Sequence, residues 1–113
     1  MAYTQQLLYE PLRSVDTSTL SGSYVPLGTA LAYPASIVKL VNNSTVPVTV
    51  STDGINDMDI APTDSFFLYD VTTNGPSNGG DDGIFIPQGT QYLISGSAGT
   101  GLVYLVVQYI KRV

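Results

Sequence analysis

The chain contains neither cysteine nor histidine among its 113 residues. Without cysteine, no disulfide framework, thiolate nucleophile or cysteine metal site can form. Without histidine, the common nucleophile–base pairs cannot be assembled. Glu10 is the single glutamate, and every aspartate lies in or beside a turn signal, which disfavours a paired-carboxylate glycosidase. We therefore expect no catalytic residues and no cofactor.

Basic residues are also scarce. Arg13, Lys39, Lys111 and Arg112 are outnumbered by nine acidic residues, so the formal net charge is −5 and no basic stripe exists. Neutralising phosphates takes clustered Lys and Arg, so we expect no direct nucleic-acid binding. The N-terminus lacks the features of a signal peptide, and the longest apolar run is too short to cross a bilayer as a helix. These features predict folding in a cytoplasm and no membrane partner.

The composition that is present favours one folded domain. Apolar residues make up 43% of the chain and charged residues 12%, which supplies ample material for a core. The aromatic residues are eight Tyr and three Phe, with no Trp. Because Tyr buries its ring while keeping its hydroxyl at a wet edge, this usage suits a thin sandwich whose faces meet other proteins or sugars.

The stretch 37–70 sets the fold class, because it has the pattern of consecutive strands. A β-branched run over 37–41 is followed by turn residues at 42–44, and apolar and polar residues alternate over 46–51. A polar loop then leads to an aromatic-aliphatic strand at 66–69.

Further short strands are expected at 20–28, 84–86 and 91–95, and a glycine-rich hairpin loop at 96–101. The total is roughly seven or eight closely spaced strands without helical periodicity. The sequence thus predicts an all-β, single-domain antiparallel β-sandwich or jelly roll over residues 20–113.

The two ends of the chain indicate contacts with other subunits. Residues 102–110 are apolar at both odd and even positions, so this strand is either central with both faces covered or has one face in a subunit interface. Residues 1–19 form an expected extended arm whose Pro11 favours an edge strand or a docking tail. The predicted interface residues are Leu7, Leu8, Tyr9, Tyr104, Val106 and Tyr109.

The densest group of possible metal ligands is acidic. Asp53, Asp57 and Asp59, with Asp64 nearby, offer the hard oxygen ligands that calcium prefers. Their spacing is not that of an EF-hand loop, because glycine directly follows the first Asp and no Glu closes the set. Asp53, Asp57 and Asp59 remain calcium candidates, and solvated turn acids are the alternative interpretation.

Two loops invite other functions. The segment 96–101 is glycine-rich, but it has no Lys in the phosphate-loop position and leads into a strand, so a turn explains it. The long polar loop 72–83, together with the tyrosines, suits a surface glycan. In that alternative the chain is a carbohydrate-binding module of a receptor-binding fibre, and Asp81 and Asp82 contribute to sugar binding.

Four segments in order carry a resemblance: IVKLVNN at 37–43, VTVSTDGIND at 48–57, FFLYD at 66–70 and IPQGT at 86–90. This order of strands and turns resembles small β-sandwich structural proteins of tailed bacteriophages. The resemblance implies a virion component present in many copies, with no enzymatic residues to carry over. It implies either a capsid decoration (cement) protein or a component of the head-to-tail neck or the tail.

The residues agree with this expectation, since an extended arm, a two-faced apolar strand and few charges describe a module that assembles. We expect a homo-oligomer whose other partners are virion proteins of the capsid, portal or tail. The expected location is the virion, assembled in the host cytoplasm. An intracellular adaptor domain of no viral origin stays open as an alternative.

Overall fold

The computed structural model describes residues 5–70 and 86–112, with side chains described over 7–70 and 86–110. Within these ranges the chain forms nine strands and one turn of 3-10 helix. The elements are β1 (Gln5–Tyr9), β2 (Arg13–Asp16), η1 (Thr17–Thr19), β3 (Val25–Pro26), β4 (Ile37–Ser44), β5 (Val48–Ser51), β6 (Asp59–Ala61), β7 (Ser65–Asp70), β8 (Leu93–Ser95) and β9 (Gly101–Arg112).

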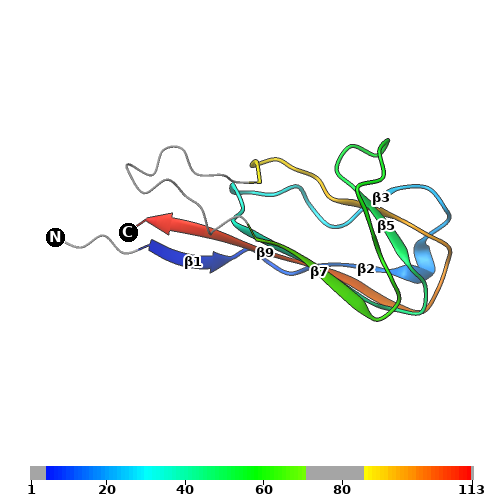
Figure 1. Cartoon of the computed structure of the whole chain (residues 1–113). Helices are drawn as coiled ribbons and strands as arrows, with labels where there is room; N and C mark the ends of the chain where they lie inside the picture. Colours follow the sequence, from blue (N-terminus) through cyan, green and yellow to red (C-terminus); the bar gives the residue numbers. More distant parts are fainter. Residues whose placement is uncertain (1–4, 71–85, 113) are drawn as a thin grey trace.

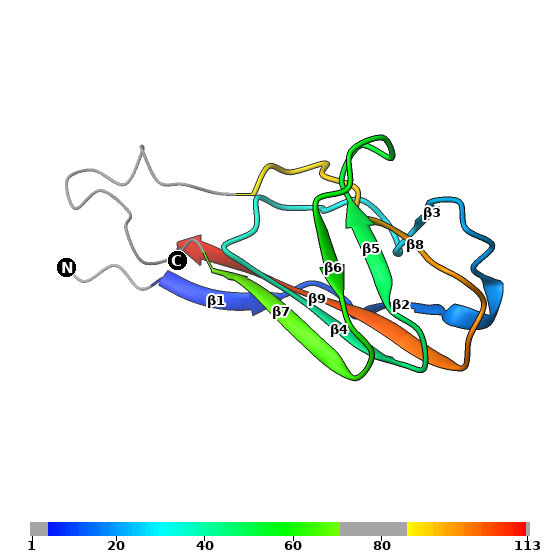
Figure 2. The same ribbon diagram turned by 45° about the vertical axis from the view of Figure 1, so that its right-hand side comes forward.

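The strands build two antiparallel sheets that pack face to face (Figures 1 and 2). Sheet A has the order β1-β9-β4-β7, and β2 also pairs with β9. Sheet B has the order β3-β8-β5-β6. The expected all-β antiparallel sandwich is confirmed, whereas its jelly-roll form stays a prediction.

The core lies between the two sheets. Alternate residues of β4 and β9 point into it from sheet A, among them Val38, Leu40 and Leu105. Val48, Val50 and Ile94 meet them from sheet B, and each of these six side chains is fully buried. Leucines from the connections complete the layer: Leu20, Leu27 and Leu31.

The turn expected at 42–44 is wrong, because β4 continues to Ser44. Asn42 occupies an inward position and is fully buried. Its Nδ2 donates to the carbonyl oxygens of Val46 at 2.8 Å and Ala61 at 2.9 Å. The Asn42 amide therefore hydrogen-bonds backbone carbonyls where the chain turns from β4 into β5. The turn itself begins after Ser44.

Other strand limits also differ from expectation. β6 was expected to be part of a polar loop, and its three residues are too few to show an alternating pattern. The loop at 96–101 is not a hairpin, since it joins β8 of sheet B to β9 of sheet A. Of the strand expected at 84–86, Ile86 forms an isolated bridge with Ala35, and residues 84 and 85 lie outside the described residues.

The N-terminal segment is extended and pairs with β9 of the same chain. β1 pairs antiparallel with residues 108–112 of β9, and β2 pairs with residues 102–105. Pro11 lies between the two strands, where its missing N–H removes no ladder hydrogen bond. Of the two interpretations for this segment, the structure has the edge strand, and a contact of the arm with a neighbouring subunit stays a prediction.

Candidate assembly surface

Sheet A has a second face that points away from the core, called here the outer face of sheet A. Since strand side chains alternate, the residues of β9, β4 and β7 that do not point toward the core lie on it. Phe66 is 61% exposed and Leu68 is 50% exposed. The large apolar residues of this face are Leu7, Tyr9, Ile37, Val41, Phe66, Leu68, Leu102, Tyr104, Val106 and Ile110.

The strand register makes these residues contiguous. Val41 lies between Tyr104 on β9 and Phe66 on β7. In the next outer row, Lys39 lies between Val106 and Leu68. Side chains directly opposite each other on antiparallel strands contact one another, so the two rows form one apolar band across the sheet. A contiguous apolar patch of this kind marks an interaction surface.

Lys39 adds one positive charge to this band. Its Nζ lies 4.8 Å from the centre of the Phe66 ring, within cation–π distance. Arg13 is the other basic residue whose side chain is described, and it is buried in an ion pair with Glu10. Lys39 is therefore the basic side chain, within the described part of the chain, that the outer face presents to a partner.

The structure separates the predicted interface residues into two groups. Leu7, Tyr9, Tyr104 and Val106 share the outer face of sheet A. Leu8 and Tyr109 lie opposite each other on β1 and β9, and their side chains point to the other face of sheet A, toward the inside of the sandwich.

Tyr109 is engaged within the chain. Its ring stacks on Tyr33 with ring centres 4.1 Å apart, and burial raises the pKa of Tyr109 above its usual value. Tyr109 and Leu8 thus lie on the inner side of β9 and β1 and are not part of the outer face of sheet A.

The sequence reasoning missed Phe66 and Leu68 as interface residues. The signal was present, because residues 66–69 are apolar at odd and even positions alike, as are residues 102–110. Phe67 and Tyr69 pack against the core, and Phe66 and Leu68 point outward. A two-faced apolar pattern in two strands of one sheet therefore predicts an apolar outer face.

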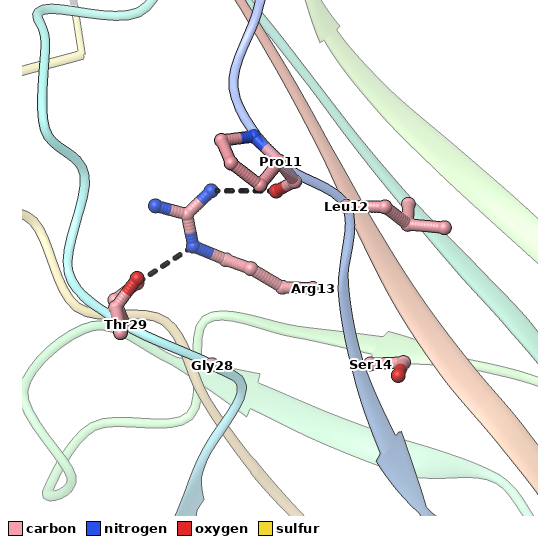
Figure 3. Close-up of a pocket in the computed structure, with 6 residues that line it drawn as sticks. All are labelled: Pro11, Leu12, Arg13, Ser14, Gly28 and Thr29. Atoms are coloured by element: carbon pink, nitrogen blue, oxygen red, sulfur yellow. Dashed lines mark hydrogen bonds between the residues drawn. The ribbon is translucent and has the colours of Figure 1, made fainter.

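A shallow groove of about 360 Å³ lies beside β2 (Figure 3). Arg13 crosses it: Nε donates to the Thr29 carbonyl at 2.7 Å and Nη1 donates to the Pro11 carbonyl at 3.4 Å. Nη2 donates to Glu10 Oε1 at 2.7 Å and to the Ala30 carbonyl at 3.0 Å. Four of the five N–H groups of the guanidinium thus have acceptors within the protein, and its charge is paired with Glu10.

The three aspartates that are calcium candidates each accept hydrogen bonds from different groups of the protein. Asp53 Oδ1 accepts from the backbone N–H groups of Ile55 and Asn56, both at 2.8 Å, and from the Ser51 hydroxyl. These hydrogen bonds, that from Asn56 first, hold the pKa of Asp53 well below its usual range. Asp53 is thus the residue that shapes the loop after β5.

Asp57 and Asp59 bind two different tyrosines. Asp57 accepts from the Tyr24 hydroxyl, and Asp59 Oδ2 accepts from the Tyr69 hydroxyl at 3.0 Å. Within the described ranges, no group of three or more His, Cys, Asp or Glu residues is placed to hold a metal ion. Asp81 and Asp82, named for the sugar alternative, lie outside the described residues.

A small apolar cavity of about 240 Å³ opens between the sheets and is lined by Met58, Tyr69, Ile86 and Tyr92. Burial raises the pKa of Tyr92 to about 12. Burial, with the hydrogen bond to Asp59, also raises the pKa of Tyr69. Both phenols therefore stay neutral at physiological pH, and the cavity is a gap in the sandwich with no charged group pointing into it from the residues that line it.

No family model, curated protein or solved structure matches the chain. Within residues 5–70 and 86–112, the structure contains no helix with the length and apolar character needed to cross a membrane.

Proposed function

We propose that this chain is a structural protein of a tailed-bacteriophage virion, present in many copies as a capsid decoration protein. The observation that carries the proposal is the apolar outer face of sheet A. Phe66, Leu68 and Tyr9 are each at least half exposed there. A face of this kind is normally covered in the working assembly.

The architecture supports an assembly role. The outer face lies on paired strands of a two-sheet sandwich, so it can be covered without changing the fold. Arg13, which could otherwise bind an anion, is buried in an ion pair with Glu10 and donates to the carbonyl oxygens of Thr29 and Ala30. The resemblance of the segments at 37–43, 48–57, 66–70 and 86–90 to phage structural proteins is the reason for proposing a virion.

A neck or tail component uses the same kind of surface, and copy number separates the two locations. The carbohydrate-binding alternative depended on the loop at 72–83, which lies outside the described residues. The assembly role is favoured because Phe66, Leu68 and Tyr9 form an exposed apolar face on paired strands.

The test is the protein composition of particles purified from the phage whose genome encodes this chain. Quantitative mass spectrometry is expected to find the chain in a copy number comparable to that of the major capsid protein. A copy number that matches a single ring would move the assignment to the neck or tail. Its absence from intact particles would refute the proposal.

A further inference from the structure

Within the described ranges, β1 pairs with one strand, the C-terminal end of β9. Figures 1 and 2 show the two strands side by side, at the end of the molecule away from β3 and β5. Of the β1 side chains that the structure describes, Leu7 and Tyr9 are exposed and Leu8 is half-buried. None of these three belongs to the core cluster. β1 is therefore held chiefly by its backbone ladder to β9.

A two-residue bulge separates this strand from β2. The N–H of Glu10 donates to the carbonyl oxygen of Val107 at 3.0 Å, and Arg13 pairs with Leu105. The two residues between Glu10 and Arg13 thus lie opposite a single residue of β9, which is the arrangement of a β-bulge. The ladder along β9 is interrupted at this point, between the two strands.

The bulge has the properties of a hinge. Both of its residues, Pro11 and Leu12, are exposed. Pro11 has no N–H to lose from the ladder, and it disfavours helical backbone at Glu10, so the chain stays extended on entering the bulge. Rotation within the bulge therefore releases residues 5–10, called here the arm, while β2 keeps its place.

Glu10 fixes the arm to the rest of the sandwich. Its carboxylate accepts from Arg13 Nη2 at 2.7 Å and from the N–H groups of Ala32 at 3.2 Å and Tyr33 at 3.1 Å. These donors all lie outside the arm, so they can bind the Glu10 carboxylate of a second copy as they bind their own. The edge of β9 at 107–112, together with these three donor residues, is called here the arm site.

We propose that copies of this chain exchange their arms, so that residues 5–10 of one copy occupy the arm site of the next. The arm keeps its contacts in the exchanged form, because the arm site is the same in every copy. The closed and exchanged forms then differ little in free energy, and a high local concentration favours exchange. This inference rests on the proposed function, because an array of many copies supplies that concentration.

The test is disulfide cross-linking of the full chain, which has no cysteine of its own. Tyr9 lies opposite Gln108 in the arm site. Because the adjacent pair, Glu10 and Val107, is hydrogen-bonded, Tyr9 and Gln108 form a non-hydrogen-bonded pair, whose side chains lie close enough for a disulfide. Tyr9→Cys and Gln108→Cys are made in separate chains, and one of the two chains is isotope-labelled.

The matched control lies on the other side of the bulge. Ser14 on β2 lies opposite Tyr104 on β9, and the alternation along β9 makes this a non-hydrogen-bonded pair as well. Since β2 is not part of the arm, Ser14→Cys and Tyr104→Cys in separate chains report random collisions between copies.

Each equimolar mixture is incubated at high protein concentration under reducing conditions and then oxidised. We expect mass spectrometry to find a disulfide between positions 9 and 108 of differently labelled chains, at a yield severalfold above that between positions 14 and 104. A chain that carries both Tyr9→Cys and Gln108→Cys is expected to form covalent oligomers after the same incubation. Oxidised in dilute solution, it is expected to form the disulfide within single chains. Circular dichroism checks that each variant is folded.

Two results would overturn the inference. In the first, the doubly substituted chain forms its disulfide within single chains at every concentration, so the arm stays in its own arm site. In the second, the yields at positions 9 and 108 and at positions 14 and 104 are equal, so the cross-links arise from collisions. Neither result decides the proposed function, which depends on particle composition.

Discussion

Glu10 and Arg13 form a buried ion pair, with 2.7 Å between Glu10 Oε1 and Arg13 Nη2. The two residues are 6% and 7% exposed. The Glu10 carboxylate also accepts from the backbone N–H groups of Ala32 at 3.2 Å and Tyr33 at 3.1 Å. The pair therefore ties the N-terminal edge of sheet A to the connection that precedes β4.

Glu10→Gln is expected to lower the free energy of unfolding by about 3 kcal/mol, because it leaves the Arg13 charge buried without its partner. Urea denaturation followed by circular dichroism measures the change. The double variant Glu10→Gln/Arg13→Met is expected to recover part of the loss, since it removes the unpaired charge. A loss below about 1 kcal/mol for Glu10→Gln would mean that the pair behaves as an exposed one.

Gly28 packs against the stem of Arg13, and we expect Gly28→Ala to be destabilising for two reasons. Its φ is 73°, and an added Cβ would lie 2.5 Å from Arg13 Cγ. Gly22→Ala is the matched control, because Gly22 has a φ of 91° and no atom within 4 Å of an added Cβ. Backbone strain alone is expected to cost about 1 kcal/mol at Gly22.

The additional overlap at Gly28 is expected to raise the cost there by about 1–3 kcal/mol in chemical denaturation. Equal losses for the two alanine variants would show that Arg13 moves aside freely.

Asn42→Leu tests the buried amide at the end of β4. The variant removes the Asn42 donor from the carbonyl oxygen of Ala61, at a cost of about 1–3 kcal/mol for a buried group left unpaired. The carbonyl oxygen of Val46 also loses Asn42 but keeps the Ser44 hydroxyl as a donor at 3.0 Å. Asn43→Leu is the matched control at the exposed neighbouring position and is expected to change stability by less than about 0.5 kcal/mol. Thermal melting of the two variants compares them directly, and similar melting temperatures would contradict this role of Asn42.

Alkaline pH is expected to destabilise the fold through Tyr92. Burial raises its pKa from 10.0 to about 12, so the unfolded chain releases this proton first. The stability that depends on neutral Tyr92 is therefore complete below pH 10.0 and is lost as pH rises toward about 12.

Tyr92→Phe is expected to reduce the slope of stability against pH in this range, as measured by urea denaturation at a series of pH values. Some slope remains, because the pKa of Tyr69 is raised as well. An unchanged slope would show that Tyr92 ionises equally in both states.

The fold class was predictable because the strands of the core follow simple patterns. The alternation over 46–51 and the run at 66–69 correspond to β5 and β7, and the apolar run at 102–110 lies within β9. The end of β4 was not predictable from local sequence, since Asn and Ser favour turns unless distant carbonyls bind them. Asn42 finds such a carbonyl at Ala61, which lies 19 residues away in sequence.

The candidate surface was predictable in part. The two-faced pattern of residues 102–110 indicated an apolar face beyond the core, and Tyr104 and Val106 lie on it. That β7 lies next to β4 in the same sheet as β9 depends on sheet order, so placing Phe66 and Leu68 beside Tyr104 and Val106 on one face required the structure. The orientation of Leu8 and Tyr109 depended on strand register, which the sequence does not specify for so short an edge strand.

The measurement that tests the account most directly is hydroxyl-radical footprinting of the outer face of sheet A, on the free chain and on purified particles. Phe66, Leu68 and Tyr9 are exposed in the isolated chain, so they are expected to be oxidised readily there. In particles we expect all three to be protected relative to the free chain. Equal oxidation of Phe66 and Leu68 in free chain and particles would contradict the claim that this face is buried on assembly.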